Sequence, residues 1–62
     1  MENQFVNKVL YKDVSPEEIS AAFECDDFRI FHPYDIITMD YDTNRVNIVI
    51  DNSNVILRVY IG

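Results

Sequence analysis

The sequence has few of the residues that break, bend or cross-link a chain. Its 62 residues include one glycine, two prolines, one cysteine and no tryptophan. The single cysteine excludes an internal disulfide, so a core and its hydrogen bonds must hold the fold. With so little glycine and proline and 48% hydrophobic residues, a disordered chain is excluded. The length leaves room for one domain, residues 1–62, with one small core.

Basic residues and long apolar runs are scarce too. Five Lys and Arg against eleven Asp and Glu give a formal charge of -6, which would repel a polyanion. We therefore expect no nucleic-acid partner and no membrane partner, since no apolar run approaches the ~20 residues of a membrane span. The first residues, Met1–Gln4, lack the basic and apolar regions of a signal peptide. These features favour the cytoplasm without excluding a mature secreted chain, so the localisation stays open.

A helix start is the clearest local pattern. Ser15 can cap the first turn, Pro16 suits the first helical position, and Glu18 completes a Ser-x-x-Glu capping box. Helical spacing of apolar residues continues from there. The acidic pair 26–27 is unfavourable at a helix C-terminus, so the sequence predicts a helix at about 15–25.

Apolar, β-branched runs predict strands at 28–32, 46–51 and 55–61. The turn-forming residues 52–54 join the last two strands as an antiparallel hairpin. Residues 1–7 are mostly polar and are expected to be a loose lead-in. The predicted fold class is α+β, with one α-helix packed on a small mixed β-sheet.

The segment 34–45 is unusual because it has neither glycine nor a helix pattern. A loop of this length in so small a domain is usually functional or disordered, and its β-branched and aromatic residues favour an extended backbone. It is either a further strand or an exposed segment offered to a partner. In the second case the Arg45 guanidinium can reach back to Thr38 or Asp40 with charge-assisted hydrogen bonds. The alternative for Arg45 is an ordinary solvated arginine.

A family resemblance becomes visible from this loop onward. The run Ile-Ile-Thr-Met-Asp-Tyr at 36–41, the stretch 44–51 and the ending 58–62 resemble the potato inhibitor I family of serine-protease inhibitors. Pro33 and the Arg-x-Asn spacing are closest to that family's microbial and fungal relatives. The resemblance implies that the loop is a reactive-site loop joining two parallel strands, 28–32 and 46–51.

The resemblance also implies a function, namely reversible, substrate-like inhibition of a serine endopeptidase. The scissile bond would join Met39 to Asp40, and the apolar Met39 suits a chymotrypsin-like or subtilisin-like pocket. The neighbouring loop residues that would contact the protease are Ile36, Ile37, Thr38, Tyr41 and Asp42. The residues that would support the loop are Arg45, Asn47 and Gly62, the last through its carboxylate. The implied partner is a serine protease, and the free chain is expected to be monomeric.

Three positions depart from the pattern of that family. Asn47 stands where plant and leech members carry a second supporting arginine, so the support is either weaker or amide-based. Tyr34 replaces a common glycine, which changes the backbone angle or the start of the loop. Asp42 stands where many members have a cation, which makes the leaving side more acidic.

Other candidate chemistry is weaker. The spacing of Asp40, Asp42 and Asn44 resembles the start of a calcium loop, but the required glycine is Arg45 and no helices flank it. His32 has no second histidine or acid–base pair at a recognisable spacing, and Cys25 reads as a small buried residue. We therefore expect no enzyme activity, no cofactor and no metal. The rival function is a non-inhibitory interaction module or antitoxin-like subunit on the same scaffold.

Overall fold

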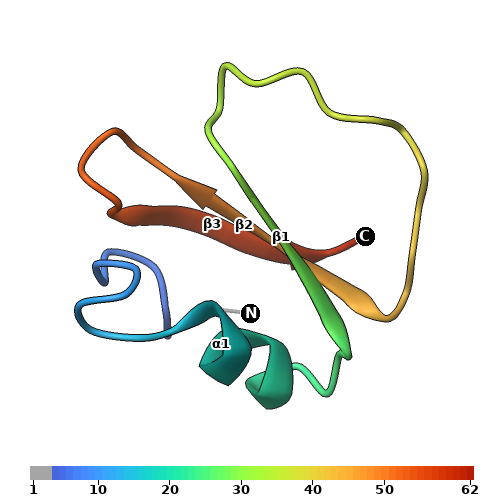
Figure 1. Ribbon diagram of the computed structural model, residues 1–62, viewed down its shortest axis with the longest axis horizontal. Helices are drawn as coiled ribbons and strands as arrows, with labels where there is room; N and C mark the ends of the chain where they lie inside the picture. The colour runs from blue at the N-terminus through green and yellow to red at the C-terminus, as the bar shows by residue number, and fades with distance from the viewer. Residues whose placement is uncertain (1–3) are drawn as a thin grey trace.

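A computed structural model of the protein describes residues 4–62, which form one helix and one three-stranded sheet (Figure 1). The strand order is β1-β2-β3, with β1 parallel and β3 antiparallel to β2, so the fold is a small α+β fold as predicted. Each strand lies within one residue of its expected bounds. The elements are α1 (Pro16–Ala22), β1 (Asp27–Phe31), β2 (Arg45–Ile50) and β3 (Ile56–Ile61).

Local side-chain chemistry determines where α1 begins. The Ser15 hydroxyl accepts the Glu18 backbone N–H at 3.2 Å, and the Glu18 carboxylate accepts the Ser15 N–H at 3.0 Å. Pro16 occupies the first turn. Two N–H groups that would lack a partner at the helix start are thus satisfied by the expected capping box.

The helix ends earlier than the predicted range of 15–25. Its last residue is Ala22, because Glu24 adopts a left-handed backbone with a φ of 57°. The Cys25 N–H then donates to the Ser20 carbonyl at 2.8 Å and closes the final turn. A non-glycine residue in this conformation leaves little trace in the sequence, which is why the prediction was too long.

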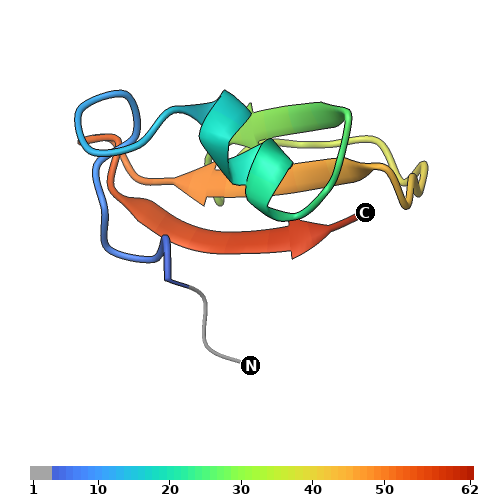
Figure 2. The same ribbon diagram turned by 90° about the horizontal axis from the view of Figure 1, so that it is seen from below.

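The two faces of the sheet have different partners. On β2, Val46, Ile48 and Ile50 are buried and pack in one core cluster with Ile19 of α1. Residues alternate across a strand, so Arg45 and Asn47 point to the opposite face. Figure 2 shows α1 covering one face of the sheet, and Figure 1 shows the long loop between β1 and β2 on the far side.

The segment before α1 is packed against the sheet. Phe5 is buried in the core cluster. The Asn7 N–H donates to the Ile56 carbonyl and the Ile56 N–H donates to the Lys8 carbonyl, both at 2.8 Å. Phe5 and Asn7 are therefore held by the core and by β3, unlike the loose lead-in expected at 1–7, whose first three residues lie outside the described part. Within residues 4–62, no helix is both long and apolar enough to cross a membrane.

Candidate functional site

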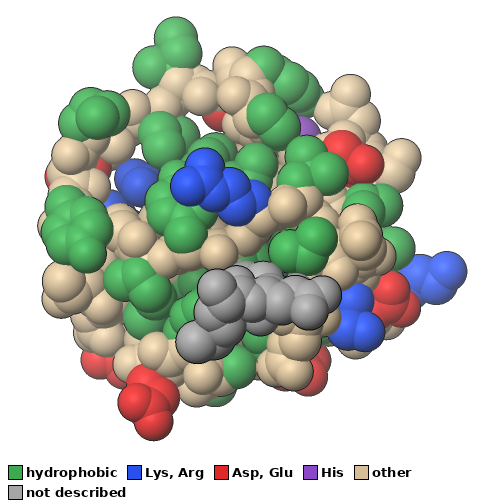
Figure 3. Space-filling model, turned by 180° about the vertical axis from the view of Figure 1, so that it is seen from behind, with side chains coloured by type: hydrophobic (Ala, Val, Ile, Leu, Met, Phe, Trp, Pro, Cys, Tyr) green, Lys and Arg blue, Asp and Glu red, His purple; other side chains and the backbone are tan. Residues whose placement is uncertain are grey.

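The long loop, residues 32–44, displays apolar side chains to solvent. Residues 36–42 form neither helix nor strand. Figure 3 shows hydrophobic side chains along the loop and a hollow in the molecular surface beneath it. Soluble proteins seldom expose several large apolar side chains together without a partner to cover them. The exposed fractions are 101% for Ile36, 95% for Met39, 73% for Tyr41 and 68% for Tyr34, whereas Ile37 is half-buried.

Arg45, the first residue of β2, holds the loop from below. Its Nη2 donates to the Asp40 backbone carbonyl at 2.8 Å, and its Nη1 donates to the Asp40 carboxylate at 3.3 Å. Its Nε donates to the Gly62 carbonyl at 2.8 Å, which orients the guanidinium from behind. Only 12% of the Arg45 side chain is exposed, so these charge-assisted bonds are partly shielded from water. Of the two contacts expected for Arg45, with Thr38 or Asp40, the structure has the one with Asp40.

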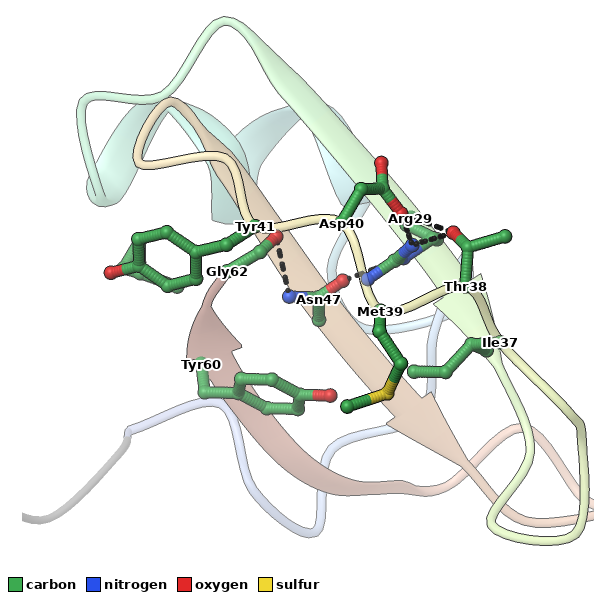
Figure 4. A pocket seen from close by; sticks show the side chains of 10 residues that line it. Arg29, Ile37, Thr38, Met39, Asp40, Tyr41, Asn47, Tyr60 and Gly62 are labelled. Carbon is green, nitrogen blue, oxygen red and sulfur yellow. Dashed lines mark hydrogen bonds and ion pairs between the residues drawn. The ribbon is translucent and has the colours of Figure 1, made fainter.

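Arg29, from the middle of β1, contributes a second guanidinium to the loop. Its Nε donates to the Asn47 side-chain oxygen at 2.8 Å, and its Nη1 donates to the Thr38 hydroxyl at 3.4 Å. The same Nη1 forms an ion pair with the Asp40 carboxylate at 3.7 Å. Figure 4 shows Arg29 between Asn47 and the Thr38–Asp40 pair. From the sequence alone Arg29 is only one residue of the predicted strand 28–32, so its contact with the loop was not predicted.

Asn47 connects the two sides of this network. Its side chain is fully buried, accepts from Arg29 and donates to the Gly62 carbonyl at 3.0 Å. Burying an amide without partners would be costly, and throughout the described residues no buried side-chain nitrogen or oxygen lacks one. The position that carries a second arginine in the resembled family therefore carries an amide here. The second guanidinium comes from the neighbouring strand.

Asp40 is the acidic centre of the network. The Thr38 hydroxyl donates to its carboxylate, and this bond, followed by the one from Arg45, holds the pKa of Asp40 below its ordinary value of 3.8. Donors that favour the ionised form lower the pKa of a carboxyl group. At neutral pH the loop therefore carries a fixed negative charge facing two guanidinium groups.

The start of the loop has its own anchors. The Tyr34 hydroxyl donates to Asn52 at 2.6 Å, and its ring stacks on His32 with centroids 5.1 Å apart. The His32 N–H donates to the Asp35 carboxylate at 2.8 Å, which is the main reason that the pKa of Asp35 is lowered. Tyr34 does not adopt the left-handed backbone, so the side chain in place of glycine ties the loop to the β2–β3 turn without that strain.

Asp42 and the end of the loop form a local turn. The Asp42 carboxylate accepts the Asn44 N–H at 2.8 Å, and its carbonyl accepts the Arg45 N–H at 3.3 Å. Among residues 4–62, no group of three His, Cys, Asp or Glu side chains is placed to hold a metal ion. Cys25, which is outside the loop, is a buried free thiol.

The hydrogen bonds of the loop with β1 and β2 support its exposed side chains.

Fold and loop together define a small α+β domain with an exposed segment that is held by hydrogen bonds from the sheet. The model of the peptidase inhibitor I78 family matches residues 7–62. The chain belongs to that family. The sequence analysis named the potato inhibitor I family of serine-protease inhibitors, so at the level of the family the correct assignment is I78.

The chain is also similar to curated proteins that are named as elastase inhibitors. The chain is 32% identical over 59 residues to the elastase inhibitor AFLEI of Aspergillus flavus, a match covering 95% of this chain and 87% of the relative. It has the same identity to the elastase inhibitor AFUEI of Aspergillus fumigatus, covering 95% and 68%. The crystal structure of elastase inhibitor AFUEI superimposes with a TM-score of 0.69 at 23% identity, covering 97% of this chain and 81% of that one. This last similarity shows the fold alone.

Proposed function

We propose that this chain is a reversible, substrate-like inhibitor of a serine endopeptidase, with Met39–Asp40 as the bond presented to the active site. The observation that carries the proposal is the placement of Met39. This residue is 95% exposed, while the residues on either side of it, Thr38 and Asp40, are bonded to guanidinium groups. Membership of a peptidase inhibitor family supports this reading of the loop.

Met39 would set the choice of protease. It is an unbranched apolar side chain, so it suits a pocket lined by apolar groups rather than the buried acid of a trypsin-like pocket. That preference agrees with relatives named as elastase inhibitors, because elastase-type pockets also lack a buried acid. The flanking residues Ile37, Thr38 and Tyr41 would pair with the protease as an added strand and supply side contacts.

The proposed reaction is ordinary peptide cleavage in which the first step, acylation of the protease by Met39, is readily reversed. The protease serine oxygen attacks the Met39 carbonyl carbon, and its proton passes through the protease histidine to the Asp40 nitrogen as the C–N bond breaks. The products are a Met39 acyl ester and a free Asp40 amine. Arg45 keeps the Asp40 carbonyl in place, so the amine remains beside the ester at high effective concentration. Return of the amine reforms the peptide bond and competes with attack by water.

Rigidity is what would separate this loop from a substrate. A flexible peptide loses conformational freedom when it enters an active site, whereas a segment already held by the scaffold loses less. The chain has no internal disulfide to supply that rigidity. The hydrogen bonds from Arg29, Arg45 and Asn47 would supply it instead.

Titration of purified proteases tests the proposal. Chymotrypsin, subtilisin and an elastase are titrated with the protein at nanomolar to micromolar concentration, with trypsin as the comparison. We expect inhibition of at least one of the first three, with mass spectrometry finding slow cleavage at Met39–Asp40 alone. Absence of inhibition of all three at micromolar concentration, or rapid cleavage at several bonds, would overturn the proposal.

A variant at Met39 sharpens the same test. Met39→Lys should move inhibition toward trypsin, because a buried acid in the trypsin pocket attracts a cation. The matched control is Leu57→Lys, which places the same charge on an exposed apolar position of β3 and should leave the preference unchanged. Equal inhibition profiles for Met39→Lys and the unsubstituted protein would mean that Met39 does not enter the pocket.

A further inference from the structure

The location of Arg29 suggests that its guanidinium group and that of Arg45 hold different sides of the Met39–Asp40 bond. In the parallel pairing of β1 with β2, Arg29 and Asn47 are direct partners, so their side chains emerge side by side on the same face. That face is the one below the loop (Figure 4). A guanidinium at either position of this pair is therefore close to Thr38 and Asp40. In this chain it is on β1.

The consequence depends on where the chain would be cut. Cleavage between Met39 and Asp40 leaves α1, β1 and Arg29 on the half that ends in Met39. The other half begins at Asp40 and carries β2, β3 and Arg45. Arg29 donates to Thr38, on its own half, and Arg45 donates to the Asp40 carbonyl, also on its own half. Arg29 also forms an ion pair with the Asp40 carboxylate, across the bond that would be cut, but at 3.7 Å this contact is longer than those of Arg45 with Asp40 at 2.8 and 3.3 Å.

We propose that Arg29 is a positioning residue for the acyl side of the Met39–Asp40 bond, while Arg45 positions the leaving side, so each end made by cleavage stays attached to its own strand. This inference rests on the proposed inhibitory function. The Arg29–Asn47 bond at 2.8 Å and the β1–β2 pairing then hold the two halves together in register. An arginine at position 47 in place of Arg29 would leave the Met39 end without a guanidinium of its own half.

The first test needs no protease. Backbone ¹⁵N relaxation of the free protein reports ps–ns motion at each amide of the loop. Arg29→Gln should increase motion mainly at residues 37–39, and Arg45→Gln mainly at residues 40–42. Arg58→Gln is the control, because Arg58 lies on the same face but over the Tyr60 ring, 4.4 Å from its centroid. Equal loosening of both segments by both variants, or no loosening by Arg29→Gln, would overturn the proposal.

The second test follows the two directions of the reaction with a protease that the protein inhibits. Arg29→Gln should slow attack on the Met39 carbonyl, so resynthesis from the cleaved form falls about tenfold, as expected for one charge-assisted hydrogen bond. Arg45→Gln should instead raise net hydrolysis, because the Asp40 amine is no longer held near the ester. Changes of the same step and size in both variants would refute the division.

Two further variants keep the tests decisive if Arg29→Gln folds poorly. Arg29→Lys retains the charge but not the planar fork, so it should rescue resynthesis only in part. The exchange Arg29→Asn with Asn47→Arg moves the guanidinium to the partner position. Compared with Arg29→Gln, this exchange should restore the order of residues 37–39 in the intact protein. It should not restore the resynthesis of the Met39–Asp40 bond from the cleaved form. If the exchange restored both the order of residues 37–39 and resynthesis, it would not matter which strand carries the guanidinium group, and the proposal would be overturned. If the protein inhibits no protease, the relaxation arm still decides the role of Arg29.

Discussion

The two faces of the sheet are built from the same strands but are held in opposite ways. Below the sheet, Val46, Ile48 and Ile50 pack with α1 in an apolar core. Above it, Arg45 and Asn47, which alternate with those residues on β2, hold the loop with hydrogen bonds. One strand thus contributes Val46, Ile48 and Ile50 to the core and Arg45 and Asn47 to the support of the loop. Substitutions on the two faces should therefore separate folding from function.

The largest effect on stability is expected on the core face. Ile48→Ala removes a fully buried side chain, so it should lower the free energy of unfolding by about 3 kcal/mol, a large share for so small a domain. Urea unfolding followed by circular dichroism measures this loss. Protease inhibition by the molecules that remain folded should be unchanged. A loss of inhibition at concentrations where the variant is still folded would break the separation of the faces.

Arg45→Gln should have a smaller effect on stability than Ile48→Ala and a larger effect on inhibition. The loss of bonds to Gly62 and Asp40 should cost about 1–2 kcal/mol of stability, less than Ile48→Ala, because the core is untouched. The loop should nevertheless lose its support, so slow cleavage becomes rapid turnover by the protease. Time courses of intact protein with catalytic protease, read by mass spectrometry, measure it. Unchanged cleavage would mean that Arg45 does not brace the loop.

A smaller effect is expected at the start of α1, remote from the loop. Ser15→Ala removes the oxygen that accepts the Glu18 N–H and should lower stability by about 1 kcal/mol. Thermal unfolding measures the change, and Ser15→Asp, which retains a capping oxygen, is the matched control. Both variants should inhibit like the unsubstituted protein. A changed inhibition constant would show that α1 and the loop are coupled through the sheet.

The smallest effect on stability is expected from protonation of Asp40 at low pH. The pKa of Asp40 is lower in the folded state than its ordinary 3.8, so its ionised form stabilises the fold at higher pH. That contribution begins to fall as the pH drops toward 3.8 and disappears below the folded-state pKa. NMR titration of the Asp40 carboxyl carbon should show the lowered midpoint. Asp40→Asn should remove this part of the acid dependence, and an ordinary midpoint would contradict the bonding described here.

The sequence predicted the helix and the three strands but not the residue at which the helix ends. The helix start was predictable because Ser15, Pro16 and Glu18 are neighbours that bond to one another. The three strands followed from runs rich in apolar and β-branched residues. The early end of α1 was not predictable, because the left-handed backbone of Glu24 is an unusual choice for that residue.

Of the two guanidinium groups that contact the loop, the sequence indicated that of Arg45 and not that of Arg29. Arg45 lies five residues from Asp40, close enough in sequence for the contact to be expected. Arg29 lies 18 residues from Asn47, and only the parallel pairing brings them together. A signal was nevertheless present, since Arg29 and Asn47 each interrupt an apolar strand at the same position of the pair. Two polar residues that interrupt neighbouring strands deserve to be tested as partners when the strands are expected to be parallel.

The segment at 7–9, which pairs with the start of β3, has a consequence for self-association. An uncovered strand edge is a template onto which another chain can add. The backbone bonds that Asn7 and Lys8 make with Ile56, and the bridge between Val9 and Val55, occupy that edge where β3 begins. Shortening the chain through Val9 would free it, so the truncated protein should aggregate or form strand-paired dimers at concentrations where the full chain does not.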